Sequence, residues 1–117
     1  MNQTPKKYLI LLYDDTFDGL LSSIFDVYRL KLEDFDINTT KNFKEKLFQP
    51  TLNVLTNKAK SNRIKIGLKR KTGQNLLPYL HQLFLKKSDK EEVIFQLIHR
   101  VFYPTVIGSK PHYTANT

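Results

Sequence analysis

The sequence of 117 residues contains no cysteine. This absence excludes a disulfide framework, a thiolate zinc site and a cysteine nucleophile, and it suits a reducing compartment such as the cytosol. Long hydrophobic runs are also missing, because the longest, from Tyr8 to Tyr13, has six residues. Such a run is too short for a membrane span or for the core of a signal peptide, so we expect a cytoplasmic protein with no membrane segment.

Residue patterns that carry catalysis are also scarce. The four glycines stand apart from one another, so neither a phosphate-cradling loop nor a nucleophile elbow is present. The histidines lack the spacing of metal ligands, and a metal cluster would depend entirely on the fold: His81, His99 and His112. We therefore predict no catalytic residue, no metal site and no cofactor. We favour binding over catalysis for this chain alone, and an enzyme fragment with a pocket of its own is the less favoured alternative.

Acidic residues are unevenly distributed. The net charge is +8, yet residues 1–56 hold seven basic and eight acidic side chains, whereas residues 57–117 hold twelve and three. No carboxylate occurs between Asn57 and Ser88. The positive field of this stretch should attract polyanions, of which nucleic acid is the commonest. The alternative is that the basic composition only maintains solubility.

The first half of the chain mixes strand and helix patterns. Residues 8–13 predict a buried strand, and residues 51–56 predict a second, weaker one. Residues 33–40 are acidic and polar without a period and predict a loop, while residues 41–48 predict a short helix before Pro50. A longer amphipathic helix ends near Leu30, and its apolar face is formed by Phe17, Leu20, Leu21, Ile24, Phe25 and Tyr28.

Three acidic residues lie at the start of that helix: Asp14, Asp15 and Asp18. Asp15 or Thr16 can cap the exposed amides, and a carboxylate at Asp18 favours the positive end of the helix dipole. A metal site is the alternative, but no further ligand lies nearby in the sequence. We therefore interpret the three acidic residues as part of the start of the helix, through capping and the helix dipole, and not as metal ligands.

The second half of the chain is predicted to be helical over residues 57–70, 74–86 and 88–103. The last of these helices opens with a capping box formed by Ser88 and Glu91, and it should end before Pro104. We predict one α+β domain over residues 1–103, mainly helical, in which a two-stranded sheet is covered by about four helices. Residues 104–117 lack an apolar period and predict a loose C-terminal tail.

The candidate binding site is the predicted helix 57–70. Its lysines form a stripe, because Lys58, Lys65 and Lys69 lie within about 40° of one another at 100° per residue. A second basic row has i, i+7 spacing, and such rows match a phosphate backbone, although a solvated helix face is the alternative. The candidate nucleic-acid-binding residues are Lys58, Arg63, Lys65, Lys69, Arg70 and Lys71.

Residues 13–21, with the sequence YDDTFDGLL, and residues 24–28 resemble the opening of a bacterial family of DNA metabolism or repair proteins, otherwise a domain of unknown function. That opening reads tyrosine, aspartate, glycine, serine or threonine, phenylalanine, an acid and glycine. The A-x-x-x-R-I-x-x-G-L pattern of residues 59–68 and the helix of residues 76–85 resemble later parts of the family. The resemblance covers residues 7–102, and Asp15 stands where the family has glycine.

The resemblance implies a cytosolic protein encoded beside a radical S-adenosylmethionine (SAM) enzyme associated with DNA modification or repair, and some relatives are fused to a uracil-DNA-glycosylase-like domain. The family continues into a second half with a histidine-arginine and phenylalanine-rich motif, which this sequence lacks, so we expect a natural remnant or a truncated form. The leading hypothesis is an accessory module that binds nucleic acid, with DNA expected. The alternative is a protein-interaction module that docks on the radical SAM enzyme or the glycosylase-like partner without contacting nucleic acid.

Overall fold

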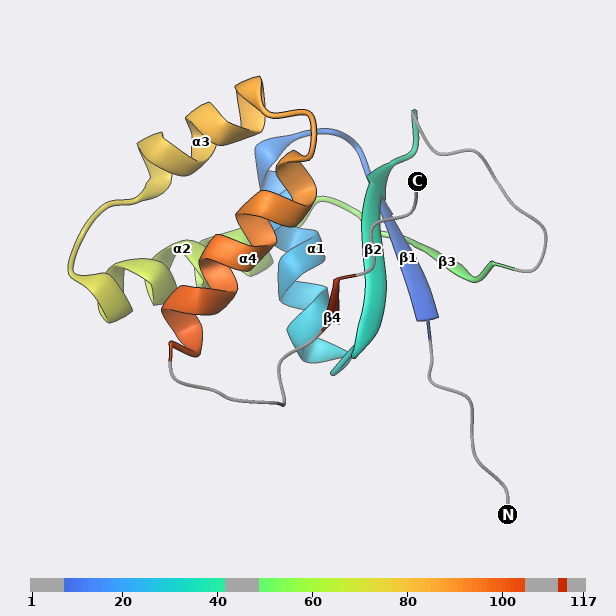
Figure 1. Cartoon of the computed structure of the whole chain (residues 1–117), viewed down its shortest axis with the longest axis horizontal. Coiled ribbons are helices and arrows are strands. Elements are labelled where there is room, and N and C mark those ends of the chain that lie inside the picture. The colour runs from blue at the N-terminus through green and yellow to red at the C-terminus, as the bar shows by residue number, and fades with distance from the viewer. Residues whose placement is uncertain (1–7, 42–48, 105–111, 114–117) are drawn as a thin grey trace, which may run out of the picture.

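The computed structural model describes residues 8–41, 49–104 and 112–113 (Figure 1). In chain order its elements are β1 (Tyr8–Tyr13), α1 (Phe17–Arg29), β2 (Asp34–Thr39), β3 (Thr51–Asn53), α2 (Lys58–Thr72), α3 (Leu77–Lys86), α4 (Lys90–Phe102) and β4 (His112–Tyr113). All strand pairs are parallel, in the order β3-β1-β2-β4, and β4 has only two residues. The four helices of the described ranges gather on one side of this small sheet (Figure 1). The mixed architecture of helices and a small sheet confirms the coarse prediction, but within the described ranges the sheet has four strands in place of the two that were expected.

The prediction of a loop over residues 33–40 was wrong, because residues 34–39 form strand β2 along the full length of β1. Phe35 and Ile37 of this strand are buried in the core. Side chains alternate between the two faces of a strand, so Asp34, Asp36 and Asn38 occupy the opposite face. These polar residues hid the strand pattern, because a strand of a parallel sheet is expected to be apolar on both faces.

Other sequence predictions differ in their boundaries. The strand predicted over residues 51–56 spans only Thr51–Asn53. Most of the short helix predicted over residues 41–48, namely residues 42–48, and most of the predicted tail lie outside the described residues. Within the described part of that tail, residues 112–113 pair with β2 as strand β4.

Helix α1 connects β1 to β2 and begins as the sequence predicts. Thr16 is its N-cap, and the Thr16 hydroxyl accepts a hydrogen bond from the Gly19 amide at 2.9 Å. Leu20, Leu21 and Ile24 are fully buried against the sheet and the other helices. Burial of each such side chain stabilises the fold by about 1.5–3 kcal/mol.

Helix α4 links the other helices to the sheet. Its Phe95 ring meets the ring of Phe35 edge to face, with 5.0 Å between the centroids. The predicted capping box is absent, because Asp89 is the N-cap and makes no side-chain capping bond. The carboxylate of Glu91 instead accepts a hydrogen bond of 2.6 Å from the Tyr13 hydroxyl, and this bond ties α4 to the end of β1.

Candidate nucleic-acid interface

Helix α2 carries all of the basic residues that were predicted to bind nucleic acid. Its buried face is narrow and consists of Ser61, Ile64 and Leu68. Most of the remaining helix surface is exposed, and the exposed predicted residues are Lys58, Arg63, Lys69, Arg70 and Lys71. The sixth, Lys65, is only partly exposed. The structure therefore gathers these side chains on one element and gives one of them a different environment.

Lys65 forms an ion pair with helix α1. Its ammonium group lies 2.9 Å from Oδ1 of Asp18, which also accepts a hydrogen bond of 2.6 Å from the Ser61 hydroxyl. These hydrogen bonds, from Ser61 first and then Lys65, hold the pKa of Asp18 below its usual value. In the lysine stripe predicted from Lys58, Lys65 and Lys69, the charge of Lys65 is therefore neutralised by Asp18.

Lys60 forms the second ion pair between the two helices. Its Nζ lies 2.8 Å from Oδ1 of Asp26, a carboxylate that is nearly buried and that Arg29 also contacts at 2.9 Å. Between the two ion pairs, the Ser22 hydroxyl accepts a bond of 3.0 Å from the Asn57 amide. Helix α2 is thus held on α1 by charge pairs and by a bond at its first turn.

These α1 residues are the part of the site that sequence reasoning missed. Asp18, Ser22 and Asp26 have i, i+4, i+8 spacing, which places them in one polar row along α1. An amphipathic helix that carries such a polar row, in addition to its apolar face, can pack a second, polar helix against that row. That spacing was the signal available in the sequence.

The other basic side chains of α2 form no ion pair with a carboxylate among the described residues. None of the ion pairs found there includes Lys58, Lys69, Arg70 or Lys71. The guanidinium of Arg63 lies over the ring of Phe25, with 5.9 Å to the centroid, and keeps its charge at the surface. Helix α2 therefore presents five cations that form no ion pair within the described ranges, while its two paired lysines fix its position. After the hydrogen bonds from Ser61 and Lys65, the charge of Lys58 also contributes to the lowered pKa of Asp18.

The end of β1 offers a different site, which the chain fills with its own side chains. In open parallel sheets, ligands bind beyond the carboxyl ends of the strands, where the strand order reverses. At this edge the Asp14 carboxylate accepts bonds from the Thr16 hydroxyl at 2.6 Å and the Thr56 hydroxyl at 2.7 Å. Partial burial raises the pKa of Asp14, but these bonds outweigh it and hold the pKa below its usual value. An anionic carboxylate beside the α1 N-terminus disfavours phosphate binding there.

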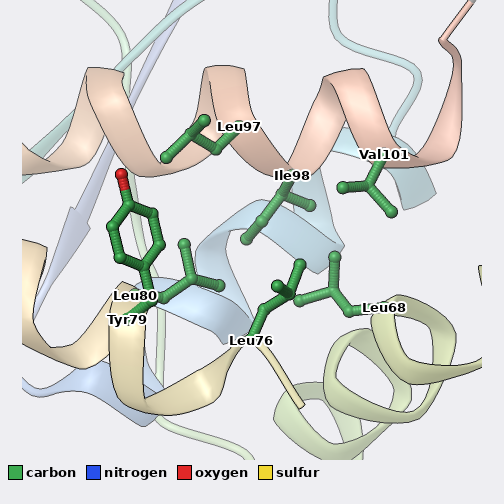
Figure 2. Close-up of a pocket in the computed structure, with 7 residues that line it drawn as sticks. All are labelled: Leu68, Leu76, Tyr79, Leu80, Leu97, Ile98 and Val101. Atoms are coloured by element: carbon green, nitrogen blue, oxygen red, sulfur yellow. The ribbon is translucent and has the colours of Figure 1, made fainter. Parts of the chain in front are cut away.

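An apolar cleft of about 190 Å³ lies between α2, α3 and α4. Figure 2 shows the side chains of Leu68, Leu76, Tyr79, Leu80, Leu97, Ile98 and Val101 around it. Tyr79 is 59% exposed, so this lining side chain is accessible from solvent. The lining contains no histidine, carboxylate or basic group, so the cleft lacks the convergent polar groups that an active site needs.

The histidines whose side chains are described have structural partners. The ring of His81 packs edge to face against Phe17 at 5.3 Å between centroids. The Nδ1 of the buried His99 lies 2.7 Å from the Tyr28 hydroxyl, and the two rings stack. Over the described ranges, no group of three or more histidine, aspartate or glutamate residues is placed to hold a metal ion.

No protein-family model, curated protein or solved structure matches this chain. The resemblance to the DNA metabolism or repair family therefore stays a prediction. Among the helices of the described residues, none has both the length and the apolar character needed to cross a membrane.

Proposed function

We propose that this chain is an accessory nucleic-acid-binding module of a DNA repair or modification system and that it contacts phosphates through α2. The observation that carries the proposal is the set of five cations on one helix that is held on α1 by two ion pairs, while the five cations themselves form no ion pair among the described residues. Point charges in rows on a fixed helix suit a phosphate backbone, which requires no base-specific geometry.

Two positions of the family-like motif support this reading. Asp15, where the family has glycine, adopts a φ of 62°, a conformation that glycine favours. A Cβ atom added to Gly19 would clash with Oδ1 of Asp14, so any other residue there would displace that carboxylate. The backbone at both positions thus suits the motif of the family that the sequence resembles.

The salt dependence of binding follows from the number of free cations. Five phosphate contacts give a slope of about −4.5 for log K against log salt on duplex DNA, so affinity should fall roughly 500-fold between 50 and 200 mM salt. Fluorescence anisotropy with a labelled 20-base-pair DNA duplex measures this slope directly.

A matched pair of triple variants tests the site. Lys58→Gln, Lys69→Gln and Arg70→Gln together should reduce the slope to about −1.8, because two phosphate contacts remain. The control replaces three exposed cations outside α2, Lys86, Lys87 and Arg100, by glutamine and should keep the slope of the parent protein. Equal weakening by the two triple variants, or binding to DNA that does not depend on salt, would contradict the proposal.

Docking of a protein partner is the second candidate function, and the apolar cleft between α2, α3 and α4 favours it. The partner implied by the family resemblance is the radical SAM enzyme or the glycosylase-like protein. Binding through the cleft should survive 1 M salt, and Tyr79→Ala should weaken it, whereas Leu85→Ala, at a residue of the same helix that is 67% exposed, should not. Capture of the partner that is lost at high salt or unaffected by Tyr79→Ala would argue against this function.

A further inference from the structure

The exposed face of α2 has an ordered layout. At 100° per residue, Lys58 and Lys69 form one edge of this face, and Arg63 and Arg70 form the other edge about 120° away. Between the two edges lie Asn62, Ile66 and Ala59, all of them exposed. Ile66 is 51% exposed, which is high for a large apolar side chain. The exposed face of α2 therefore has a central strip of uncharged residues, both polar and apolar, with a row of cations along each side.

This layout distinguishes between forms of nucleic acid. Single strands are bound by aromatic side chains on which the bases stack, and α2 contains no aromatic residue. The ring of Phe25 lies beneath the guanidinium of Arg63 and is partly buried. A site with cations and no stacking platform gains little from unpaired bases.

The dimensions match a B-form groove. A helix with its side chains is about 10–12 Å wide, and the major groove of B-DNA is about 12 Å wide and 8.5 Å deep. A helix in that groove has a phosphate backbone on each side and base edges in front of it. Two cationic edges correspond to the two backbones, and the strip between them corresponds to the bases.

The chemistry of the strip also suits base edges. An asparagine amide pairs with adenine through two hydrogen bonds, and an apolar side chain contacts the methyl group of thymine. Asn62 and Ile66 lie next to each other on the helix surface at i, i+4 spacing, so both would face adjacent bases of one strand segment.

We infer that the ligand of this site is B-form duplex DNA, with α2 lying in the major groove, the lysine edge and the arginine edge each on one backbone, and Asn62 and Ile66 at the base edges. This inference rests on the proposed phosphate-binding function of α2. Duplex RNA is the natural comparison, because it carries the same kind of charge but has a deep, narrow major groove that excludes a helix.

The test compares the unmodified protein on three labelled probes of one sequence and length: duplex DNA, single-stranded DNA and duplex RNA. At 100 mM salt we expect duplex DNA to bind at least about tenfold more tightly than either other probe. Methyl green, which occupies the major groove, should compete, and netropsin, which occupies the minor groove, should not. Equal affinity for the three probes would overturn the groove inference and leave phosphate binding intact. The absence of salt-dependent binding to every probe would overturn the proposed function itself.

A variant pair then tests the strip. Ile66→Ala should weaken binding to duplex DNA about fivefold, because an apolar contact with the bases is lost, and should leave binding to single strands unchanged. Leu85→Ala removes a similarly exposed apolar side chain from α3 and should change neither affinity. Equal effects of Ile66→Ala on duplex and single-stranded DNA would overturn the groove placement.

Discussion

Replacing Gly19 by alanine tests how the chain holds the start of α1 and, through Thr56, the segment that leads into α2. An added Cβ would clash with Oδ1 of Asp14 and would lie 2.8 Å from Oγ1 of Thr16, so both side chains have to move. Thr16 would lose its capping bond, which costs about 1 kcal/mol. Displacing the carboxylate from its exposed hydrogen bonds costs about a further 1–2 kcal/mol.

Helix propensity acts in the opposite direction. Alanine in place of glycine inside a helix is favourable by about 1 kcal/mol, so the net effect of Gly19→Ala is a destabilisation of about 1–2 kcal/mol. Urea unfolding followed by circular dichroism measures this change as a lower midpoint at constant slope. A variant that is about 1 kcal/mol more stable than the parent would refute the reasoning, because propensity alone predicts that sign.

A double-mutant cycle assigns the cause. In the Asp14→Ala background the obstructing carboxylate is gone, so Gly19→Ala should become neutral or stabilising, with a coupling of about 1 kcal/mol or more. Gly73→Ala is the matched control. Gly73 has a φ of 71° with nothing within 4 Å of an added Cβ, so alanine there should cost about 1–2 kcal/mol in both backgrounds.

Three further outcomes follow from the charges and the buried phenol. Lys69→Gln should reduce the salt slope of DNA binding by about 0.9, whereas Lys65→Gln should leave that slope unchanged and lower the thermal midpoint, because Lys65 is engaged with Asp18. The lowered pKa of Asp18 contributes stability that is fully present above its ordinary pKa of 3.8 and is lost as the pH falls through the lowered value. The urea midpoint of the parent protein should therefore fall in acid, and Asp18→Asn should make this fall smaller when midpoints are measured against pH. Burial raises the pKa of the Tyr28 phenol above 10.0, so the neutral phenol stabilises the folded protein fully below pH 10 and this contribution is lost at more alkaline pH. Tyr28→Phe should remove that alkaline loss of stability. Because it also removes the bond to His99, it should lower the free energy of unfolding at pH 7 by about 1 kcal/mol.

The sequence alone predicted the helices with bounds close to those observed, because helix formation depends largely on local sequence. The helices predicted over residues 57–70 and 88–103 span Lys58–Thr72 and Lys90–Phe102. Strand β2 was missed because its pairing with β1 is a long-range property, and three polar residues on one face concealed it. Local patterns cannot reveal a strand that is stabilised mainly by pairing with β1 and by the helix α1 that connects the two strands.

The sequence predicted which helix carries the basic residues, but it did not predict which of them form ion pairs. Spacing correctly grouped the basic residues of α2 on one helix, because helical geometry is local. Which lysine is neutralised depends on the packing of α1 against α2, which brings Asp18 to Lys65 across 47 residues of sequence. Charge counting along the chain therefore overestimates the free cations of a helix that docks on an acidic neighbour.

Lys58 lies at a position where its charge does not help the helix, so a role of that charge in DNA binding can be distinguished from a role in stability. The N-terminus of a helix carries partial positive charge, so a cation there is unfavourable by about 0.3–1 kcal/mol, and α2 has no acidic residue in its first turn. Lys69, Arg70 and Lys71 lie in the last turn, where the helix dipole favours them. Lys58→Gln should therefore keep or raise the urea midpoint while it reduces the salt slope of DNA binding by about 0.9. A variant that loses stability and keeps its DNA affinity would instead identify Lys58 as an electrostatic partner of Asp18, whose pKa it helps to lower.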